Sequence, residues 1–295
     1  MIKVVVPATT ANCCVGFDCL GMALDWWSTF TFEPADQWLI TGCPKEFSGP
    51  DNLVLQGFKI TCEKLKKECP SFHLHIDSSL PSSRGFGSSA MCIVAGIEGA
   101  NAWFGSPLTK LEMLDIATRF EGHPDNVGPA LMGNVSVSFM EGDQIYSTPM
   151  PCADWKLLAM VPDQEVPTAQ ARKVLPKSLS LDHTKKQVAY ALSFMQALQT
   201  GDLTLLEASC HDFIHEPYRK HLISAYEPIH QYCQDHGIPM WISGSGSTMI
   251  AIHHASEPLA ALQSFADGLH LFCKEVHISK KGAYVVYEEV FRSIE

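Results

Sequence analysis

Arg84-Gly-Phe-Gly-Ser-Ser-Ala90 is the most informative segment of this 295-residue chain. Two glycines and two serines lead into an apolar run, Met91 to Ala102, which predicts a buried helix. Glycines let backbone N–H groups approach an anion closely, and the positive end of the helix dipole points at the same place. The segment therefore predicts a phosphate-binding loop at a helix start, with a simple helix-capping turn as the plainer alternative.

Ser88 and Ser89 suit three tasks, because their hydroxyls can cap the helix, bind phosphate oxygens or reach a Mg²⁺ ion. The segment also fits the dinucleotide pattern G-x-G-x-x-A. That pattern follows directly on an apolar strand, however, whereas Pro81-Ser-Ser-Arg84 precedes the first glycine here. The Walker A pattern G-x-x-x-x-G-K-[ST] does not occur in the sequence. Both of these nucleotide-binding loops are therefore excluded.

The composition argues against a general nucleic-acid or anionic-membrane surface. The chain carries 21 Lys and Arg against 32 Asp and Glu, a net charge of −11, so any phosphate site must be local. The N-terminus lacks the long apolar core of a signal peptide, and no apolar run reaches membrane-spanning length. Eleven cysteines without a C-x-x-C pair indicate reduced thiols, so we expect a cytoplasmic protein.

Apolar periodicity predicts strands and helices in mixed order, which favours an α+β fold over a regular βαβ alternation. Strands are predicted at 2–6, 26–32, 37–41, 72–76, 135–139, 143–148, 156–161, 239–242 and 249–253. Helices are predicted from an N-cap at Asp51 to about Cys69, and at 91–102, 108–120, 168–174, 184–199, 204–214 and 222–234. We expect a domain boundary near residue 150, with one domain at 1–150 and a second at 151–295.

Two further segments are unusually polar for their positions: residues 7–21, which contain Pro7-Ala-Thr-Thr-Ala-Asn12, and Glu121-Gly-His-Pro-Asp-Asn126. Each alone would be read as a turn with a satisfied Asn or Asp. Residues 7–21, the glycine-serine loop and Ser243-Gly-Ser-Gly-Ser247 resemble, in this order, the three motifs of the GHMP small-molecule kinases, which phosphorylate a metabolite hydroxyl with ATP. The similarity spans residues 4 to about 252.

This resemblance implies an N-terminal domain of the ribosomal-protein-S5 type, a C-terminal ferredoxin-like domain and an active site between them. Four segments resemble the members that act on L-homoserine: residues 16–21, 121–127, 171–176 and 215–219. The expected substrates are therefore ATP and L-homoserine, with Mg²⁺. The resemblance also makes a homodimer possible, and neither a nucleic acid nor a membrane is expected as a partner.

The resemblance assigns roles residue by residue. Substrate binding falls to Asn12, Asp18, His123, Arg172, Arg219, Gly244 and Gly246. Nucleotide binding falls to Asn52, Pro81, Arg84, Gly85, Gly87, Ser88 and Ser89, and the Mg²⁺ ligands are Ser89 and Glu121. Catalysis is assigned to Glu121, Ser89, Asp18 and Thr168. Among these, Asp18 is the nearest candidate for accepting the proton of the substrate hydroxyl. Its alternative role is to bind the ammonium group of the substrate. The bidentate fork of arginine suits the substrate carboxylate.

Plainer readings stay open for some of these residues. Asn52 can simply start a helix, Thr168 can be an N-cap, and Glu121 can be a surface charge. His211 and His215 have the spacing of a zinc site, but the Glu that zinc proteases place after the first His is missing and Glu216-Pro217 is expected to end the helix.

The sequence also departs from the family pattern. Cys13-Cys14 stand where Leu-Gly is usual, Phe86 replaces Leu, Asn134 replaces a glycine and Ser247 replaces Pro. Loss of a glycine beside Asn12 can reshape the substrate pocket. A kinase for another small alcohol, or a non-catalytic relative that binds small molecules, therefore remains an alternative.

Overall fold

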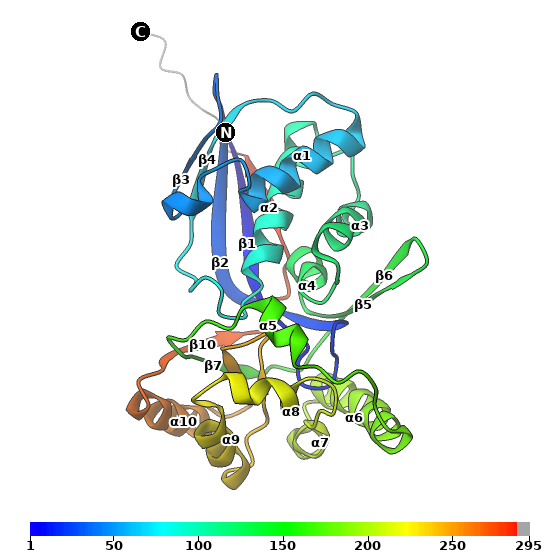
Figure 1. Cartoon of the computed structure of the whole chain (residues 1–295), viewed down its shortest axis with the longest axis vertical. Coiled ribbons are helices and arrows are strands. Elements are labelled where there is room, and N and C mark those ends of the chain that lie inside the picture. Colours follow the sequence, from blue (N-terminus) through cyan, green and yellow to red (C-terminus); the bar gives the residue numbers. More distant parts are fainter. Residues whose placement is uncertain (288–295) are drawn as a thin grey trace.

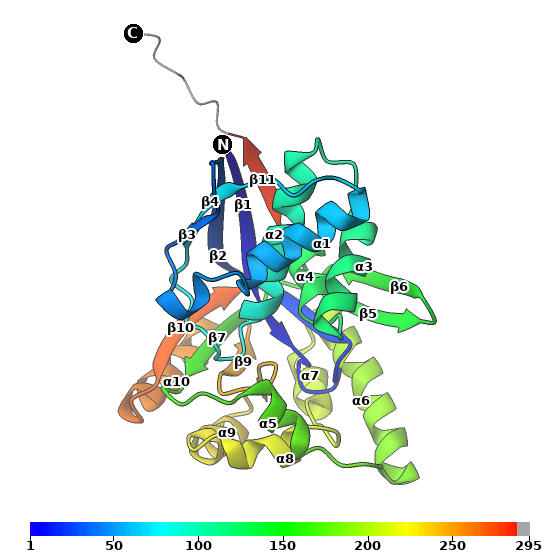
Figure 2. The ribbon, with the colours of Figure 1, turned by 45° about the horizontal axis from the view of Figure 1, so that its top comes forward.

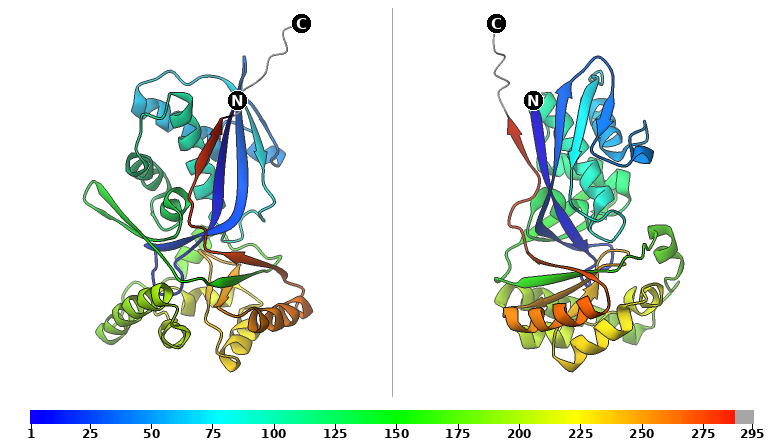
Figure 3. Two further views of the ribbon diagram at one scale, coloured as in Figure 1. Left: turned by 180° about the vertical axis from the view of Figure 1, so that it is seen from behind. Right: turned by 90° about the vertical axis from the view of Figure 1, so that its left-hand side faces the viewer.

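Two sheets, each covered by helices, form the structure, a computed structural model that describes residues 1–287 (Figure 1). In the first sheet the order is β11-β1-β2-β4-β3, and β5 branches from β2 to pair with β6. Its strands are β1 (Ile2–Ala11), β2 (Leu20–Pro34), β3 (Leu39–Thr41), β4 (Phe72–Asp77), β5 (Val135–Glu141), β6 (Gln144–Met150) and β11 (Tyr284–Tyr287). The helices α1 (Leu53–Leu65), α2 (Ser88–Trp103), α3 (Lys110–Glu121) and α4 (Val127–Met132) cover one face of this sheet (Figure 3).

The second sheet is antiparallel, in the order β10-β7-β9-β8. Its strands are β7 (Lys156–Val161), β8 (Met240–Ile242), β9 (Met249–His253) and β10 (Phe272–His277). Its helices are α5 (Thr168–Lys173), α6 (Leu181–Thr200), α7 (Leu203–Ser209), α8 (Glu216–Arg219), α9 (Tyr226–Asp235) and α10 (Ser256–Gly268). Two short 3₁₀ turns, Lys45–Phe47 and Lys220–Leu222, complete the described part of the chain.

The first sheet with its helices is called the upper lobe, and the second sheet with its helices is called the lower lobe. Strand β7 shows how the two lobes share a core. Leu157, Ala159 and Val161 point toward α6, α7 and the lower part of β1 and β2, while Leu158 and Met160 point toward α9 and α10. This alternation is the two-residue period of a strand that is buried on both faces. The hydrophobic cluster on the first of these faces contains residues of both lobes, so buried packing holds the lobes against each other.

Most predicted elements are confirmed, and the misplaced ends have local causes. The cap of α1 is Asn52 and not Asp51, because the Asn52 Oδ1 accepts bonds from the backbone N–H groups of Val54 (2.9 Å) and Leu55 (3.3 Å). Helix α1 ends at Leu65 rather than near Cys69, since Lys66 adopts a left-handed conformation (φ 54°).

The segment after α7 differs most from the prediction of one helix over 204–214. Helix α7 stops at Ser209, and the Asp212 carboxylate then accepts bonds from the backbone N–H groups of His215 and Glu216. The prediction that Glu216-Pro217 ends a helix is wrong, because these residues open α8, and proline is tolerated in a first turn. The predicted helix at 222–234 begins only at Tyr226. Elements α10, β10 and β11 had no counterpart in the sequence analysis.

The predicted α+β class is confirmed by two mostly antiparallel sheets with separate helices. The chain changes from the first sheet to the second between β6 and β7, and β11 then returns to pair with β1. The division into 1–150 and 151–295 stays a prediction. Within residues 1–287, no helix combines the length and the apolar character that crossing a membrane would require.

The core of the upper lobe contains a cluster of aromatic rings that generates a stability prediction. Phe58 is fully buried, and its ring centroid lies 4.5 Å from that of Phe72 and 5.7 Å from that of Phe32. We expect Phe58→Ala to lower the free energy of unfolding by about 3–5 kcal/mol, because a large buried ring leaves a cavity. Chemical denaturation measures this change. Phe47→Ala is the matched control, since Phe47 is 52% exposed, and an equal loss in both variants would contradict this account of the core.

Candidate active site

A cavity of 210 Å³ lies between the two lobes, where the loop joining β1 and β2 reaches down to the lower lobe (Figure 2). Segments far apart in the sequence meet there. It is lined by Asn12, Asp18, Ser83, Gly85, Gly87, Ser88, Ser89, Glu121, His123, Asp125, Asn126, Val166, Pro167, Thr168, Arg172, Arg219, Gly244 and Ser245. The three predicted motifs therefore line one cavity.

The glycine-serine loop forms one wall and touches both lobes. Gly85 and Gly87 have positive φ angles of 91° and 67°. A Cβ atom on Gly85 would lie 2.3 Å from the backbone oxygen of Ser243, and one on Gly87 would lie 2.1 Å from the Oγ1 of Thr9. Both positions therefore require glycine for conformation and for space. The Ser243 hydroxyl also donates to the Gly85 carbonyl at 2.6 Å.

The start of α2 faces the cavity without a side-chain cap. Gly87 is the N-cap residue, and Met91 N–H donates to its carbonyl at 2.8 Å. The first N–H groups of a helix have no partner within the helix, so this turn presents backbone donors and the positive end of the helix dipole. Ser88 and Ser89 of this turn line the cavity. These features are suited to binding a phosphate group.

Ser89 and Glu121 are brought together across the cavity wall. The Ser89 hydroxyl donates to the Glu121 carboxylate at 2.9 Å. Burial raises the pKa of Glu121 above its ordinary value; the bond from Ser89 and the nearby His123 oppose that rise, and Asp125 adds to it. A hydroxyl and a carboxylate oxygen next to a phosphate-binding turn are the hard donors that Mg²⁺ prefers, so these two residues fit the predicted ligand pair.

A larger cavity of 710 Å³ adjoins the first and shares Ser83, Ser88 and Ser89 with it. Its other walls come from the segments 42–53 and 76–82 and from Phe30, Met91 and Cys92. Asn52 lines this larger cavity, but its amide also caps α1 and donates to the Phe47 carbonyl at 2.7 Å. The structure thus gives Asn52 a structural role and leaves its predicted adenine contact untested.

The β1–β2 loop carries Asn12 and Asp18 into the cavity. Asn12 donates to the Gly244 carbonyl at 2.8 Å and accepts from the Asp18 N–H at 2.9 Å, so one amide links the upper lobe to the third motif and fixes its own loop. Asn12 and Asp18 both have positive φ angles, of 66° and 58°. Asn and Asp tolerate this region better than most residues.

The two predicted arginines lie on the opposite side of the cavity. Arg172 of α5 makes two hydrogen bonds of 3.0 Å to the Asp18 carboxylate, which joins the lobes by a bidentate ion pair. Arg219 of α8 is buried and donates to the carbonyls of Gly244 (2.8 Å) and Ala171 (3.3 Å). Burial, and then the charge of Arg172, lower the pKa of Arg219. Two mutually repelling guanidinium groups at one cavity favour an anionic ligand.

Sequence analysis did not identify Phe17, Asp125, Asn126 and Ser245. The ring of Phe17 lies 5.2 Å from the Arg219 guanidinium carbon and stacks on His215. Asp125 is buried and bonds to the Nδ1 of His123 at 2.5 Å, which raises the pKa of His123. Phe17 and Asp125 lie within two positions of predicted residues in the motifs, which was the available signal. The partners of Phe17, Arg219 and His215, lie far from it in the sequence and beyond any local pattern.

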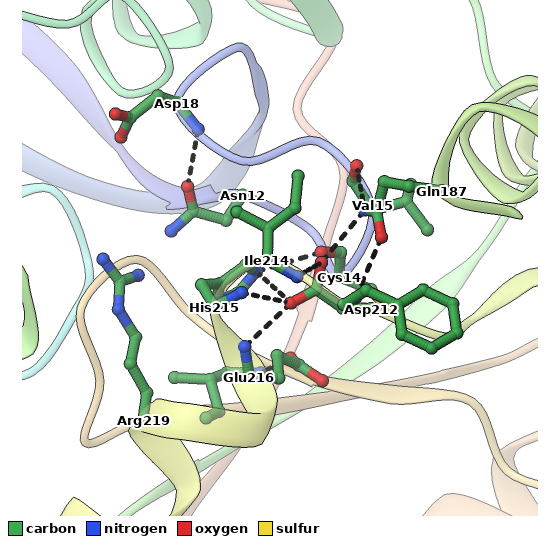
Figure 4. A network of polar contacts seen from close by, with 12 residues as sticks. Asn12, Cys14, Val15, Asp18, Gln187, Asp212, Ile214, His215, Glu216 and Arg219 are labelled. Atoms are coloured by element: carbon green, nitrogen blue, oxygen red, sulfur yellow. Dashed lines mark hydrogen bonds and ion pairs between the residues drawn. The ribbon is translucent and has the colours of Figure 1, made fainter. Parts of the chain in front are cut away.

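A network of polar contacts fixes the lower side of the site (Figure 4). The Asp212 carboxylate accepts bonds from the backbone of α8 and from the Gln187 side chain, and Gln187 also donates to the Val15 carbonyl at 2.9 Å. Figure 4 shows the Arg219 guanidinium pointing from α8 toward Asn12. The position of Arg219 therefore depends on contacts that also hold the β1–β2 loop.

The remaining predicted residues are less central to the cavity. Thr168 lines it as the first residue of α5, after the cap Pro167, and so is not itself an N-cap. Arg84 points away to bind Glu165 at 2.8 Å. Pro81 comes just before the glycine loop and does not belong to the described lining of either cavity. Gly246 lies in the turn of the third motif, behind Gly244.

Comparison with known proteins identifies the class that this geometry suggests. Residues 52–134 match the family model for the GHMP kinases N terminal domain, and residues 194–271 match the one for the GHMP kinases C terminal domain. The chain belongs to the GHMP kinases. The α+β fold with two domains, which was expected from the resemblance to this family, is therefore confirmed.

Individual homoserine kinases are similar to this chain over most of its length. The chain is 37% identical over 255 residues to a homoserine kinase of Clostridium botulinum (strain 657 / Type Ba4), covering 85% of this chain and 86% of that protein. It is 33% identical to the homoserine kinase of strain Eklund 17B / Type B, covering 97% and 99%. The crystal structure of homoserine kinase from Cytophaga hutchinsonii superposes with a TM-score of 0.85 at 28% identity and covers 97% of both chains.

Proposed function

We propose that this chain transfers the γ-phosphoryl group of ATP to the side-chain hydroxyl of L-homoserine, which yields O-phospho-L-homoserine and ADP. The observation that carries this proposal is the arrangement of the 210 Å³ cavity. The uncapped start of α2 lies on one side of it, and Arg172, Arg219 and Asp18 lie on the other. This is a phosphate site facing a set of charges that complements an amino acid, and the named relatives support the same substrate.

The nucleotide is assigned to the glycine loop and the larger cavity beside it. Gly85, Gly87, Ser88 and Ser89 would hold the phosphates, and the 710 Å³ cavity has room for the adenosine, with Asn52 in its wall. Pro81 and Arg84 are assigned a supporting part, since they flank the loop. Ser89 and Glu121 would hold Mg²⁺, which supplies charge neutralisation on the phosphates when it is bound.

The amino acid is assigned to the arginine side. The carboxylate of homoserine would take the guanidinium groups of Arg172 and Arg219, and its ammonium group would take Asp18. These residues are already paired, because Arg172 binds Asp18 with two hydrogen bonds. A zwitterion can replace that pair charge for charge, so neither residue loses an ionic partner. Asn12, His123, Gly244 and Gly246 would complete the substrate site.

Catalysis in this proposal rests on alignment. Phosphoryl transfer passes through a loose transition state, so positioning and charge neutralisation contribute more than a strong base. In this proposal the α2 amides hold the transferred group and the arginines hold the acceptor. Thr168, which lines the cavity, is assigned to contact the γ-phosphate through its hydroxyl. Asp18 is the carboxylate assigned to accept the hydroxyl proton if a base is used. Cytoplasmic localisation and a homodimeric state remain parts of the proposal that come from composition and resemblance.

A substrate panel tests the proposed activity. Purified protein with ATP and Mg²⁺ is assayed for ADP release with homoserine, mevalonate, shikimate and galactose. We expect turnover with homoserine and little with the others, because only homoserine presents both an ammonium and a carboxylate group. Turnover with another alcohol and none with homoserine would refute the substrate assignment, and no turnover at all would favour a non-catalytic relative.

Arg172→Lys tests the carboxylate site. Lysine keeps the charge but loses the bidentate fork, so we expect the KM for homoserine to rise about 10- to 100-fold, the value of a charge-assisted hydrogen bond, while the KM for ATP stays the same. Steady-state kinetics measure both constants. Lys173→Ala is the matched control on the next, exposed residue. Equal effects on the two substrates would argue against this assignment.

Glu121→Gln tests the metal site. We expect kcat to fall about 100-fold because an ionic ligand worth several kcal/mol is lost, with an unchanged melting temperature. The pKa of Glu121 is raised, so in the wild type activity should decline with falling pH at a higher pH than for an ordinary glutamate, as the carboxyl takes up a proton. The variant should lack that decline. Glu63→Gln, on the exposed side of α1, is the control. If Glu121→Gln were as active as the wild type, Glu121 could not be a ligand of the metal.

A further inference from the structure

Arg219 is a buried cation, and no ion pair among residues 1–287 includes it. It is 2% exposed, and its Nε and Nη1 atoms donate to the carbonyls of Ala171 (3.3 Å) and Gly244 (2.8 Å). Removing a charge from water costs free energy unless nearby groups compensate it. The two neutral carbonyl oxygens compensate part of this charge, and an aromatic ring lies against the guanidinium as well.

This ring belongs to Phe17, and it contacts both arginines of the site. Its centroid lies 5.2 Å from the guanidinium carbon of Arg219 and 5.9 Å from that of Arg172. A cation within about 6 Å of the centroid is attracted by the negative face of an aromatic ring. The attraction grows when the cation is desolvated, so it is larger for the buried Arg219. One ring therefore acts on both of the cations to which the substrate carboxylate is assigned.

The Phe17 ring is itself held in place by His215. The two rings stack with 5.5 Å between their centroids and 28° between their planes. His215 is fully buried, and its Nε2 bonds to the Cys14 carbonyl at 2.9 Å (Figure 4). Burial lowers the pKa of His215 below its ordinary value, against the opposing charge of Asp212, so the imidazole is neutral near pH 7. His215 therefore fixes the ring without adding a third positive charge beside it.

Two adjacent residues of the β1–β2 loop hold the arginines in different ways. Asp18 binds Arg172 with two hydrogen bonds of 3.0 Å, whereas Phe17 contacts the guanidinium groups only through its ring. In the proposed function the substrate replaces Asp18 on Arg172. An ion pair can be exchanged in this way, but a phenyl ring carries no charge that a carboxylate can replace. The contact with Phe17 therefore stays in place while Asp18 changes its partner.

We propose that Phe17 is a positioning residue of the carboxylate site, whose ring face holds the guanidinium groups of Arg172 and Arg219 close enough for one carboxylate to bind both. This rests on the proposed function, which assigns the substrate carboxylate to these two arginines. Phe17 is not part of the described lining of the 210 Å³ cavity, so it acts through the arginines. Burial, and then the charge of Arg172, lower the pKa of Arg219, so the two cations are held together against desolvation and repulsion. The ring offsets both costs.

A phenyl ring at this place can also serve as apolar packing alone, and the two roles need different properties of the ring. Packing depends on its volume and shape, whereas the attraction of a cation depends on the negative charge of its face. Fluorine atoms on the ring withdraw electrons from that face and change its size only slightly. A series of fluorinated rings at Phe17 therefore separates the two roles.

The test replaces Phe17 in the full-length protein by leucine, by tyrosine and by phenylalanine with one, two or three ring fluorines. We expect Phe17→Leu to raise the KM for homoserine about tenfold, the size of two cation–π contacts with partly desolvated cations. The KM for ATP should stay the same, and kcat should change little, because binding of the acid is what is lost. Phe17→Tyr keeps the ring face and should behave like the wild type. In the fluorinated series the KM for homoserine should rise with each added fluorine.

Phe139 on the β5–β6 hairpin is the matched control. It is 51% exposed, and it stacks on the neutral ring of Tyr146 with 5.2 Å between the centroids. It is also a half-exposed phenylalanine in a stacked pair, but its partner carries no positive charge. The same replacements at Phe139 should leave the KM for homoserine unchanged.

A second measurement does not depend on turnover. The magnetic field of an aromatic ring shifts the NMR signals of nearby protons, so the Nε–H signal of Arg219 should move in Phe17→Leu and stay in place in Phe139→Leu. If homoserine is not turned over but this signal moves, the substrate assignment fails and the contact between ring and guanidinium stands.

Two results would overturn the proposal. One is a KM for homoserine that is the same throughout the fluorinated series, which would reduce Phe17 to apolar packing even if Phe17→Leu is impaired. The other is an Arg219 signal that does not move in Phe17→Leu. If Phe17→Leu does not fold, the fluorinated proteins, which keep the shape of the ring, decide the question through both measurements.

Discussion

The site depends on the close approach of two backbone segments, the glycine loop of the upper lobe and the third motif of the lower lobe. A side chain at Gly85 would collide with the Ser243 carbonyl, and the Ser243 hydroxyl donates to the Gly85 carbonyl across the same gap. Beside it, the Gly244 carbonyl accepts bonds from Asn12 and Arg219, one from each lobe. These contacts set the distance between the uncapped helix start and the arginines, and with it the size of the cavity.

Buried packing supports this contact. The hydrophobic cluster between the lobes joins the inner ends of β1 and β2 to β7, β9, α6 and α7, so the lobes share a core. The polar network around Asp212 lies at the edge of that core and fixes the β1–β2 loop and α8 together. A charged and hydrated site is thus placed on rigid elements, which suits a reaction that relies on alignment.

The sequence predicted the parts of the site that local chemistry determines. A glycine-serine loop before an apolar run predicts an anion site at a helix start, and the structure has this arrangement at Gly87. The meeting of Ser89 with Glu121 followed only from resemblance to a family, because nothing local relates two residues 32 positions apart. Arg84 and Phe17 show what local sequence patterns do not predict. Arg84 stands in the right motif but pairs with Glu165, and Phe17 contacts the second arginine through a fold that no periodicity reveals. At Asn52 the helix-capping interpretation describes the structure correctly, since its amide oxygen accepts two backbone bonds.

A crystal structure of the protein with a non-hydrolysable ATP analogue and homoserine tests the central claim most directly. The claim is that one cavity holds the triphosphate against the backbone of α2 and the amino acid against the arginines. The account predicts the terminal phosphate beside Ser88 and Ser89, the homoserine carboxylate on Arg172 and Arg219, and the hydroxyl facing the phosphate. A nucleotide bound away from the glycine loop, or homoserine bound outside this cavity, would contradict it.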